Sequence, residues 1–444
     1  MQNMSEGSLF SHLWRYALPL ILTNWLQLAY NAADSMIAGR FIGKEALAAE
    51  GIAAPVMNLV ILAISGLCIG AGIYMSERYG AADLSSLRKA LAAILRTGLL
   101  MSFAIMVPGI LLTPLLLKLL SVPQEIFAIT SLYLRITFIG VPLTFIYNAL
   151  SCAMKSVGDS VRPLRFLAVS SVINIALDLI LLGVFHFGIA VSALTTVFAQ
   201  LISVLLAIRS MHADMRQLVP DGGEWKTDRE ILKKVMNYGL PAALQQAVQP
   251  IGKLLIQSRV NLLGVSTIAA FNAVSRIDSF AFIPEQSIAA AIATLIAQNR
   301  GARKPERIRR GFFTGIAMEV VYGAFIGIFF FIFGRPVISL FVKGSGTEEV
   351  IREGMSYLSV MVFLYIMPAL TNGFQGYCRG VGRIPVTILC TFIQISLRTV
   401  GTYLLAGRIG NRGIAAASAF GWGAMLLYEV PYVLNHLKHV RENL

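Results

Sequence analysis

Carboxyl side chains inside long apolar stretches are the residues of this sequence best suited to do chemistry. Tyr30 and Asp34 lie four residues apart in the first apolar stretch. Asn174 and Asp178 have the same spacing in the fifth. A spacing of four places both members of a pair on one face of a helix. An acid inside hydrocarbon costs roughly 2.5 to 3.5 kcal/mol on insertion scales, so it normally faces protein or water and serves a function.

These two helix faces would form a cation-coupling pocket if they converge beside Thr196 of the sixth stretch. Two carboxyls enclosed together cannot both stay ionised cheaply, so the pair is expected to exchange a proton near neutral pH. The same oxygens are hard ligands, and Na⁺ is the alternative ion, held by Asp34, Asn174, Asp178 and Thr196. No cofactor is expected. A purely structural role, in which Asp34 caps its helix and Asp178 is a satisfied polar group, remains the competing interpretation.

The second half of the chain carries a different set of ionisable groups. Arg276 and Asp278 are two residues apart in one apolar stretch, so they lie on different faces of a helix and need separate partners. We expect Arg276 to line a substrate cavity as a gate or counter-charge, with a structural ion pair as the alternative. Asp278 and Gln249 are further candidates for this cavity. The other acids in the apolar stretches of this half are Glu285, Glu319 and Glu429.

The elements that hold these residues must be membrane-spanning helices. The chain has 444 residues, of which 56% are hydrophobic and only 14% charged, and its mean hydropathy is +0.71. This composition is far more apolar than that of a soluble domain. Six apolar stretches lie on each side of a polar connection, and each is near the 20 residues that a bilayer about 30 Å thick requires. We predict an all-α polytopic membrane protein with twelve transmembrane helices in two six-helix bundles.

The two halves repeat each other. Residues 41–49 read FIGKEALAA and residues 262–270 read LLGVSTIAA, which match in the glycine and in the closing pair of alanines. The same repeat pairs Asp178 with Arg398, so the acidic pair belongs to the first half alone. Six helices per repeat give both halves the same orientation, so their pseudo-two-fold axis should run along the membrane normal.

The polar connection and the basic residues predict domain bounds and orientation. We expect an amino-terminal lobe over residues 1–215, a cytoplasmic linker over 216–233 and a carboxy-terminal lobe over 234–444. The net charge of +14 arises from short clusters of Lys and Arg between apolar stretches, which indicates topology and not a nucleic-acid-binding face. The positive-inside rule places both termini in the cytoplasm. We expect a monomeric, multi-pass protein of the plasma (inner) membrane whose partners are the lipid bilayer and small amphipathic molecules.

In the order of its motifs the sequence resembles the multidrug and toxic compound extrusion, or MATE, family. The resemblance rests on Asn31-Ala-Ala-Asp34, Gly39-Arg40, Ala46-Leu-Ala-Ala49, Gly158-Asp159 with Pro163, Asn174-x3-Asp178, and the Gly-Ala turns at 80 and 301. It implies two six-helix lobes that export amphipathic, often cationic, compounds in exchange for H⁺ or Na⁺.

The resemblance also implies roles for particular residues. It makes Asp34 the central coupling residue and surrounds it with Tyr30, Asn174, Asp178 and Thr196. Members of the NorM branch carry further acids in helices seven and ten. Here Gln249 stands near the first of these positions, and no acid occurs between Gly354 and Tyr428. The combination of Asp34 with Arg276 is more similar to the DinF branch, which favours proton coupling.

We therefore predict a secondary active transporter that exports amphipathic, cationic drugs or toxins in exchange for H⁺, and not an enzyme. One alternative is a flippase of a lipid-linked precursor, which a cavity faced by several cationic groups would favour. A weaker alternative is an intramembrane enzyme, but the sequence contains neither a GxGD run nor an HExxH motif.

Overall fold

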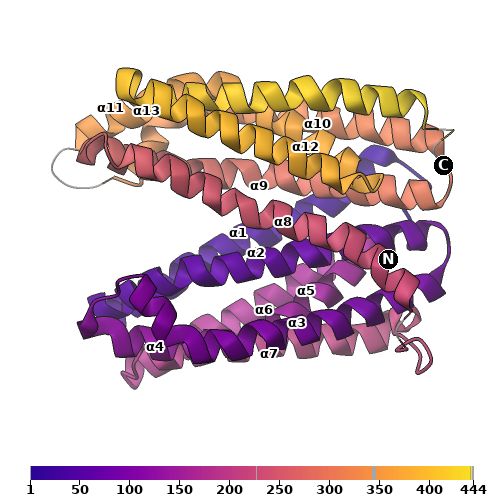
Figure 1. The fold of residues 1–444 in the computed structure, drawn as a ribbon, viewed down its shortest axis with the longest axis horizontal. Coiled ribbons are helices and arrows are strands. Elements are labelled where there is room, and N and C mark those ends of the chain that lie inside the picture. Colours follow the sequence, from indigo (N-terminus) through magenta and orange to yellow (C-terminus); the bar gives the residue numbers. More distant parts are fainter. Residues whose placement is uncertain (1, 227, 343–346, 441, 443–444) are drawn as a thin grey trace. The chain divides into compact units, whose positions relative to one another are not determined.

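The computed structural model describes residues 2–226, 228–342, 347–440 and 442, and these residues form helices joined by short connections (Figure 1). The first half contains α1 (Leu9–Phe41), α2 (Lys44–Gly80), α3 (Leu84–Leu119), α4 (Gln124–Ile139), α5 (Val141–Ser156), α6 (Val161–Asp178), the π-helix η1 (Leu179–Val184) and α7 (Ile189–Asp214). The second half contains the 3₁₀-helix η2 (Arg216–Leu218), α8 (Arg229–Val260), α9 (Val265–Gly301), α10 (Pro305–Ser339), α11 (Thr347–Leu364), α12 (Ile366–Gly380) and α13 (Ile384–Lys438).

Several spans are broken within the membrane-spanning length, and proline accounts for two of the breaks. α4 and α5 form one span from Gln124 to Ser156 that is interrupted at Gly140, next to Pro142. α11 and α12 are bent by 49° at their junction, just before Pro368. A proline has no backbone N–H to donate, and its ring prevents the normal helical bond to the preceding turn. The helix therefore restarts at each of these positions.

α13 is long enough for two passes. Its 55 residues would extend about 80 Å at a rise of 1.5 Å per residue, more than twice the thickness of a bilayer core. Its dihedral angles leave the helical region at Ile409 and Gly410, and Gly410 has a φ of +57°, a conformation that glycine adopts without strain. The break divides α13 into two arms of spanning length.

Within the described residues, eight helices are long and apolar enough to cross a membrane, or nine if the bent pair counts as one span. α1 and α8 have spanning length but fall outside this set. Adding these two helices and counting both arms of α13 gives twelve segments. The predicted all-α membrane fold is thus confirmed.

The chain folds into two compact units whose bounds cut through two helices. Unit 1 comprises Gln2 and Leu22–Ala243, and unit 2 comprises Asn3–Ile21 and the residues from Leu244 onward. The first part of α1 therefore packs in unit 2, where Leu13 and Tyr16 are buried in one core cluster with residues of α9 and α10. These bounds differ from the expected lobes over 1–215 and 234–444, because α1 and α8 each contribute to both units.

Glycines allow close backbone approach inside each unit. A Cβ atom added at Gly70 of α2 would lie 2.3 Å from the carbonyl oxygen of Tyr238 in α8. In unit 2, a Cβ atom at Gly376 would lie 2.6 Å from the carbonyl oxygen of Ala289. Lipid tails are as apolar as the side chains, so helices in a bilayer gain little from burying them and associate largely through such close packing.

We predict that Gly70→Ala destabilises unit 1 by about 1 to 3 kcal/mol, because the new methyl group overlaps the α8 backbone and forces that helix to move. Gly51→Ala on the same helix is the matched control. Among the described residues, no heavy atom outside the adjacent residues and helix backbone lies within 4 Å of that Cβ position, and alanine favours the helix by about 1 kcal/mol over glycine. Thermal unfolding in detergent should give a lower melting temperature for Gly70→Ala only. Equal melting temperatures would contradict the close approach of α2 and α8.

Candidate functional site

The acids of the first half meet in a polar cluster inside unit 1. Asp178 is the last residue of α6, at the point where that helix widens into the π-helix η1, and both it and Asn174 are fully buried. Such π-helical turns are frequent at functional sites. The Thr195 hydroxyl of α7 donates to Oδ1 of Asp178. The amide of Asn174, with its nitrogen turned toward Asp178, donates to Oδ2 at 3.1 Å and accepts from the backbone N–H of Thr196 at 3.1 Å.

Asp34 brings α1 to this cluster. Its carboxyl lies within hydrogen-bonding reach of the Asp178 carboxyl. Its Oδ1 atom is buried and has no hydrogen-bond partner among the described residues. One turn earlier, the Tyr30 hydroxyl lies 3.5 Å from the Thr196 hydroxyl, at the outer limit of a hydrogen bond. The structure therefore brings together the five residues that the sequence singled out in the first half.

Two members of the cluster were missed by the sequence analysis. Glu50 of α2 accepts a hydrogen bond of 2.8 Å from Ser35 and lies close enough to Asp34 to act on it electrostatically. Tyr133 of α4 is 9% exposed and lies near Asp34 and Glu50. Glu50 interrupts a run of small residues just before Gly51, and an acid at such a place was the signal that could have found it.

The cluster holds three carboxyls without a nearby cation. Within the described residues, the charged groups that act on Asp34, Asp178 and Glu50 are other acids, and none of the three forms an ion pair. Uncompensated carboxyls in a low-dielectric interior attract a positive species, which can be a proton, a metal ion or an organic cation. No group of three or more His, Cys, Asp or Glu side chains is placed to hold a metal ion in the described part of the chain. A Na⁺ ion at this cluster would thus depend on amide and hydroxyl oxygens beside the two aspartates.

The candidates of the second half are not assembled into one site. Asp278 is buried and accepts hydrogen bonds of 2.7 Å from the hydroxyls of both Tyr357 and Tyr365. Lys253 and Arg398 lie close enough to act on it electrostatically. Arg276 and Gln249 are instead exposed.

Neighbouring positions of unit 2 hold the buried polar groups. Gln245, one turn before Gln249, is buried and donates to Gln375 and to Thr391 at 2.9 Å each. The remaining acids of the spans, Glu285, Glu319 and Glu429, are fully buried. Arg379 of α12 lies near Glu319 and Glu429. Within the described residues, unit 2 thus contains cations close to Asp278, Glu319 and Glu429 but not to Glu285, and the cluster of unit 1 has none near its acids.

Comparison with known proteins identifies the family. A family model described as MatE matches residues 19–180 and residues 241–404. The chain is 28% identical over 417 residues to the probable multidrug resistance protein YpnP of Bacillus subtilis, a match that covers 93% of this chain and 92% of that protein. It is 24% identical over 407 residues to an FAD transporter of Shewanella oneidensis, with 88% of each chain covered.

The fold itself is similar to that of a MATE protein crystallised in complex with MaL6, with a TM-score of 0.92, 20% identity and 99% of both chains covered. The family model matches a long segment in each half of the sequence, and the similarity to these two relatives extends over most of the chain. The chain therefore belongs to the MatE family of multi-pass membrane transporters.

Proposed function

We propose that this chain is a secondary active transporter that exports amphipathic, cationic compounds in exchange for H⁺, with Na⁺ as the alternative coupling ion. Membership of the MatE family supports transport, and the B. subtilis relative is named as a probable multidrug resistance protein. The observation that carries the choice of a cation is the Asp34 carboxyl, which has a buried, unpartnered oxygen beside Asp178.

In this proposal, Asp34 is the carboxyl that binds a proton and a cationic substrate in turn. Both oxygens of Asp178 already accept hydrogen bonds, from Thr195 and Asn174. An ionised Asp34 beside Asp178 attracts a cationic substrate, and a protonated Asp34 can donate to Asp178 and loses that attraction. Proton and substrate therefore compete. A one-for-one exchange of H⁺ for a monovalent cation moves no net charge, so the pH gradient drives it, and each pH unit provides about 1.4 kcal/mol, enough for a substrate gradient of about tenfold.

The position of Asp34 on α1 couples this exchange to the rest of the chain. Pro19 lies inside α1, two residues before the helix passes from unit 2 to unit 1. A proline inside a helix permits a bend. We propose that protonation of Asp34 changes how the unit 1 part of α1 packs, with the bend near Pro19.

The lobes of the chain, the location of its termini and its oligomeric state are also part of the proposal. We propose two functional lobes, both termini in the cytoplasm and a monomer in the plasma membrane, in line with the basic clusters between spans. We also propose that the chain belongs to the DinF-like branch, because Asp34 is present and the candidate position in α8 is Gln249 and not an acid.

A first prediction concerns Asp34→Asn. The amide has the same size as the carboxyl but cannot lose a proton. The variant should therefore fold in detergent like the wild type, but it should fail to concentrate substrate across a membrane. Glu45→Gln is the control, because Glu45 is an exposed acid in the first turn of α2. Dye efflux from proteoliposomes measures both. Wild-type efflux by Asp34→Asn would reject the coupling role.

A second prediction concerns pH and the coupling ion. Protonation removes the charge that holds a cationic dye, so binding should weaken as pH falls, by up to about tenfold per pH unit for one competing proton. The Asp34→Asn variant should show no such slope. Proteoliposomes with an imposed proton gradient should accumulate the dye without Na⁺. Uptake that depends on a Na⁺ gradient alone would show that the coupling ion is Na⁺ and not H⁺.

For Asp278 the geometry favours a structural role over gating. Its two tyrosine partners lie on α11 and at the α11–α12 junction, so the carboxyl ties α9 to both helices. We infer that this bond network holds the three helices together. Arg276, which is exposed on the same helix, remains the candidate for the substrate cavity in this half, together with Gln249.

A third prediction tests that inference. Tyr357→Phe should lower the free energy of unfolding by about 1 to 3 kcal/mol, because it leaves a buried carboxyl oxygen of Asp278 without its donor. Tyr322→Phe removes a bond to the neutral carbonyl of Ala281 and should cost about 0.5 to 1.5 kcal/mol. Thermal unfolding in detergent compares the two. A Tyr357→Phe protein with wild-type stability but altered dye efflux would instead place Asp278 in the transport machinery.

A second candidate function is transport of an anionic compound, including a lipid-linked precursor. It is favoured by Lys253, an exposed cation within α8 that lies near Arg398. The relative from S. oneidensis is named as an FAD transporter, and FAD carries phosphate groups. A panel of cationic and anionic dyes in the same proteoliposomes decides between the two candidates.

A further inference from the structure

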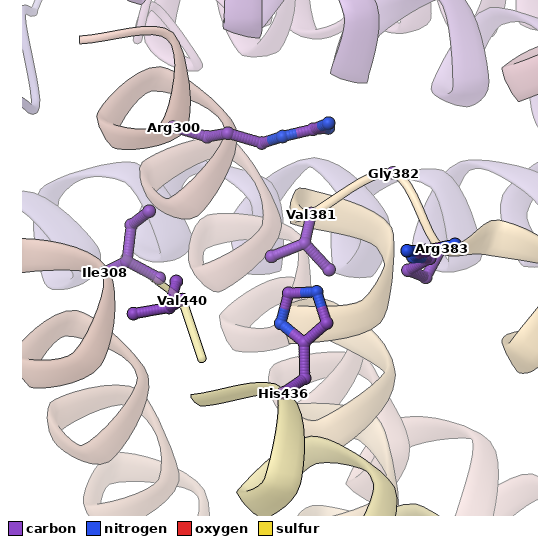
Figure 2. A pocket seen from close by; sticks show the side chains of 7 residues that line it. All are labelled: Arg300, Ile308, Val381, Gly382, Arg383, His436 and Val440. Atoms are coloured by element: carbon purple, nitrogen blue, oxygen red, sulfur yellow. The ribbon is translucent and has the colours of Figure 1, made fainter. Parts of the chain in front are cut away.

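A small basic cavity lies at one end of unit 2. It has a volume of about 200 Å³ and is found where α9 ends, α10 begins and α12 turns into α13. Three basic side chains and three apolar ones line it, namely Arg300, Arg383, His436, Ile308, Val381 and Val440. No carboxylate is among the lining residues. Figure 2 shows the basic side chains around the turn from Val381 to Arg383.

The fold positions this basic wall through two features. The turn between α12 and α13 needs Gly382, whose φ of +79° is in the left-handed region. The backbone N–H of Arg383 then donates to the carbonyl of Cys378 at 2.8 Å, which fixes the start of α13. The imidazole of His436 is held by a hydrogen bond of 2.8 Å between Nδ1 and the buried Tyr377 hydroxyl. Its other ring nitrogen is therefore left for a different partner.

The charged side chains that line the cavity in the described part of the chain are all basic. Arg300 and Arg383 both lie close enough to His436 to act on it electrostatically. Two further cations at this end are held by backbone carbonyls: Lys304 donates to that of Ser5, and Arg307 donates to those of Met4 and Gly7. Arg383 is exposed and forms no ion pair within the described residues. A cavity with such walls attracts an anion.

We propose that this cavity binds the phosphate of an anionic phospholipid headgroup. The guanidinium group offers paired N–H donors that match phosphate oxygens. The cavity lies where three long apolar helices end or begin, at residues 301, 305 and 438, so it is at the level of the headgroups. Basic pockets between helix ends at that level recognise such lipids. The apolar wall of Ile308, Val381 and Val440 would face the carbon atoms next to the phosphate. The site is independent of the acidic cluster of unit 1.

The test compares lipid binding by the whole protein and by matched variants. The protein is placed in nanodiscs of phosphatidylcholine with a small share of phosphatidylglycerol, and retained lipids are counted by native mass spectrometry. Arg383→Gln should lower the retention of phosphatidylglycerol at least threefold. Arg309→Gln should leave it unchanged, because Arg309 is an exposed cation of the same end that does not line the cavity. Equal losses in the two variants would show diffuse attraction and overturn the proposal.

A second arm separates the lipid from a free anion. Phosphatidylglycerol should raise the melting temperature of the wild type in detergent, and the same concentration of inorganic phosphate should not. Protection by inorganic phosphate to the same extent would overturn the lipid as the occupant. If Arg383→Gln does not fold, His436→Gln replaces it in the lipid-retention measurement, with the same expected loss. Wild-type retention of phosphatidylglycerol by this folded variant would contradict a role for the basic wall.

Discussion

The burial of two neighbouring carboxyls, Asp34 and Asp178, is the constraint on which the polar interior of unit 1 depends. Two unit charges 4 Å apart repel each other by about 4 kcal/mol at an effective dielectric constant of 20, and Glu50 adds a third acid nearby. The surrounding residues stabilise one of these charges only. Thr195 and Asn174 occupy the oxygens of Asp178, while an oxygen of Asp34 has no partner in the described part of the chain. A proton, a metal ion or an organic cation must therefore supply the positive charge that the described part of the protein does not place beside Asp34.

Unit 2 also contains a buried acid, Asp278, but the groups around it differ from those around Asp34. Asp278 has two tyrosine donors and lies near Lys253 and Arg398. The sequence repeat pairs Arg398 with Asp178, so a position that is acidic in one half is basic in the other. The two halves thus carry opposite charges at equivalent positions of the sequence repeat. Asp278 has two hydrogen-bond donors and two cations close to it, whereas no cation acts on Asp34, whose Oδ1 atom has no partner among the described residues. Our proposal therefore assigns the coupling role to the acids of unit 1.

Spacing along the chain predicted part of this site, and packing decided the rest. Pairs four residues apart, such as Tyr30 with Asp34, must share a helix face wherever the helix lies, so their proximity was predictable. Glu50 was missed because its helix contacts the cluster through a face that no spacing rule identifies. For the same reason the sequence did not show that Arg276 is exposed while Asp278, two residues later, is buried. The spacing of apolar stretches predicted the helices of spanning length, but the break inside α13 depends on the local backbone at Gly410.

The division of α1 between the two units was also invisible in the sequence, and it gives the acidic cluster a mechanical connection. Residues Asn3–Ile21 belong to unit 2, where the Tyr16 hydroxyl accepts from Thr294 at 3.1 Å and the Met4 N–H donates to Gln298 at 2.9 Å. The later part of the same helix carries Asp34 in unit 1. Pro19 lies between these two parts of α1, and a proline inside a helix permits a bend. In our proposal, ion exchange at Asp34 therefore acts on a helix that both units share.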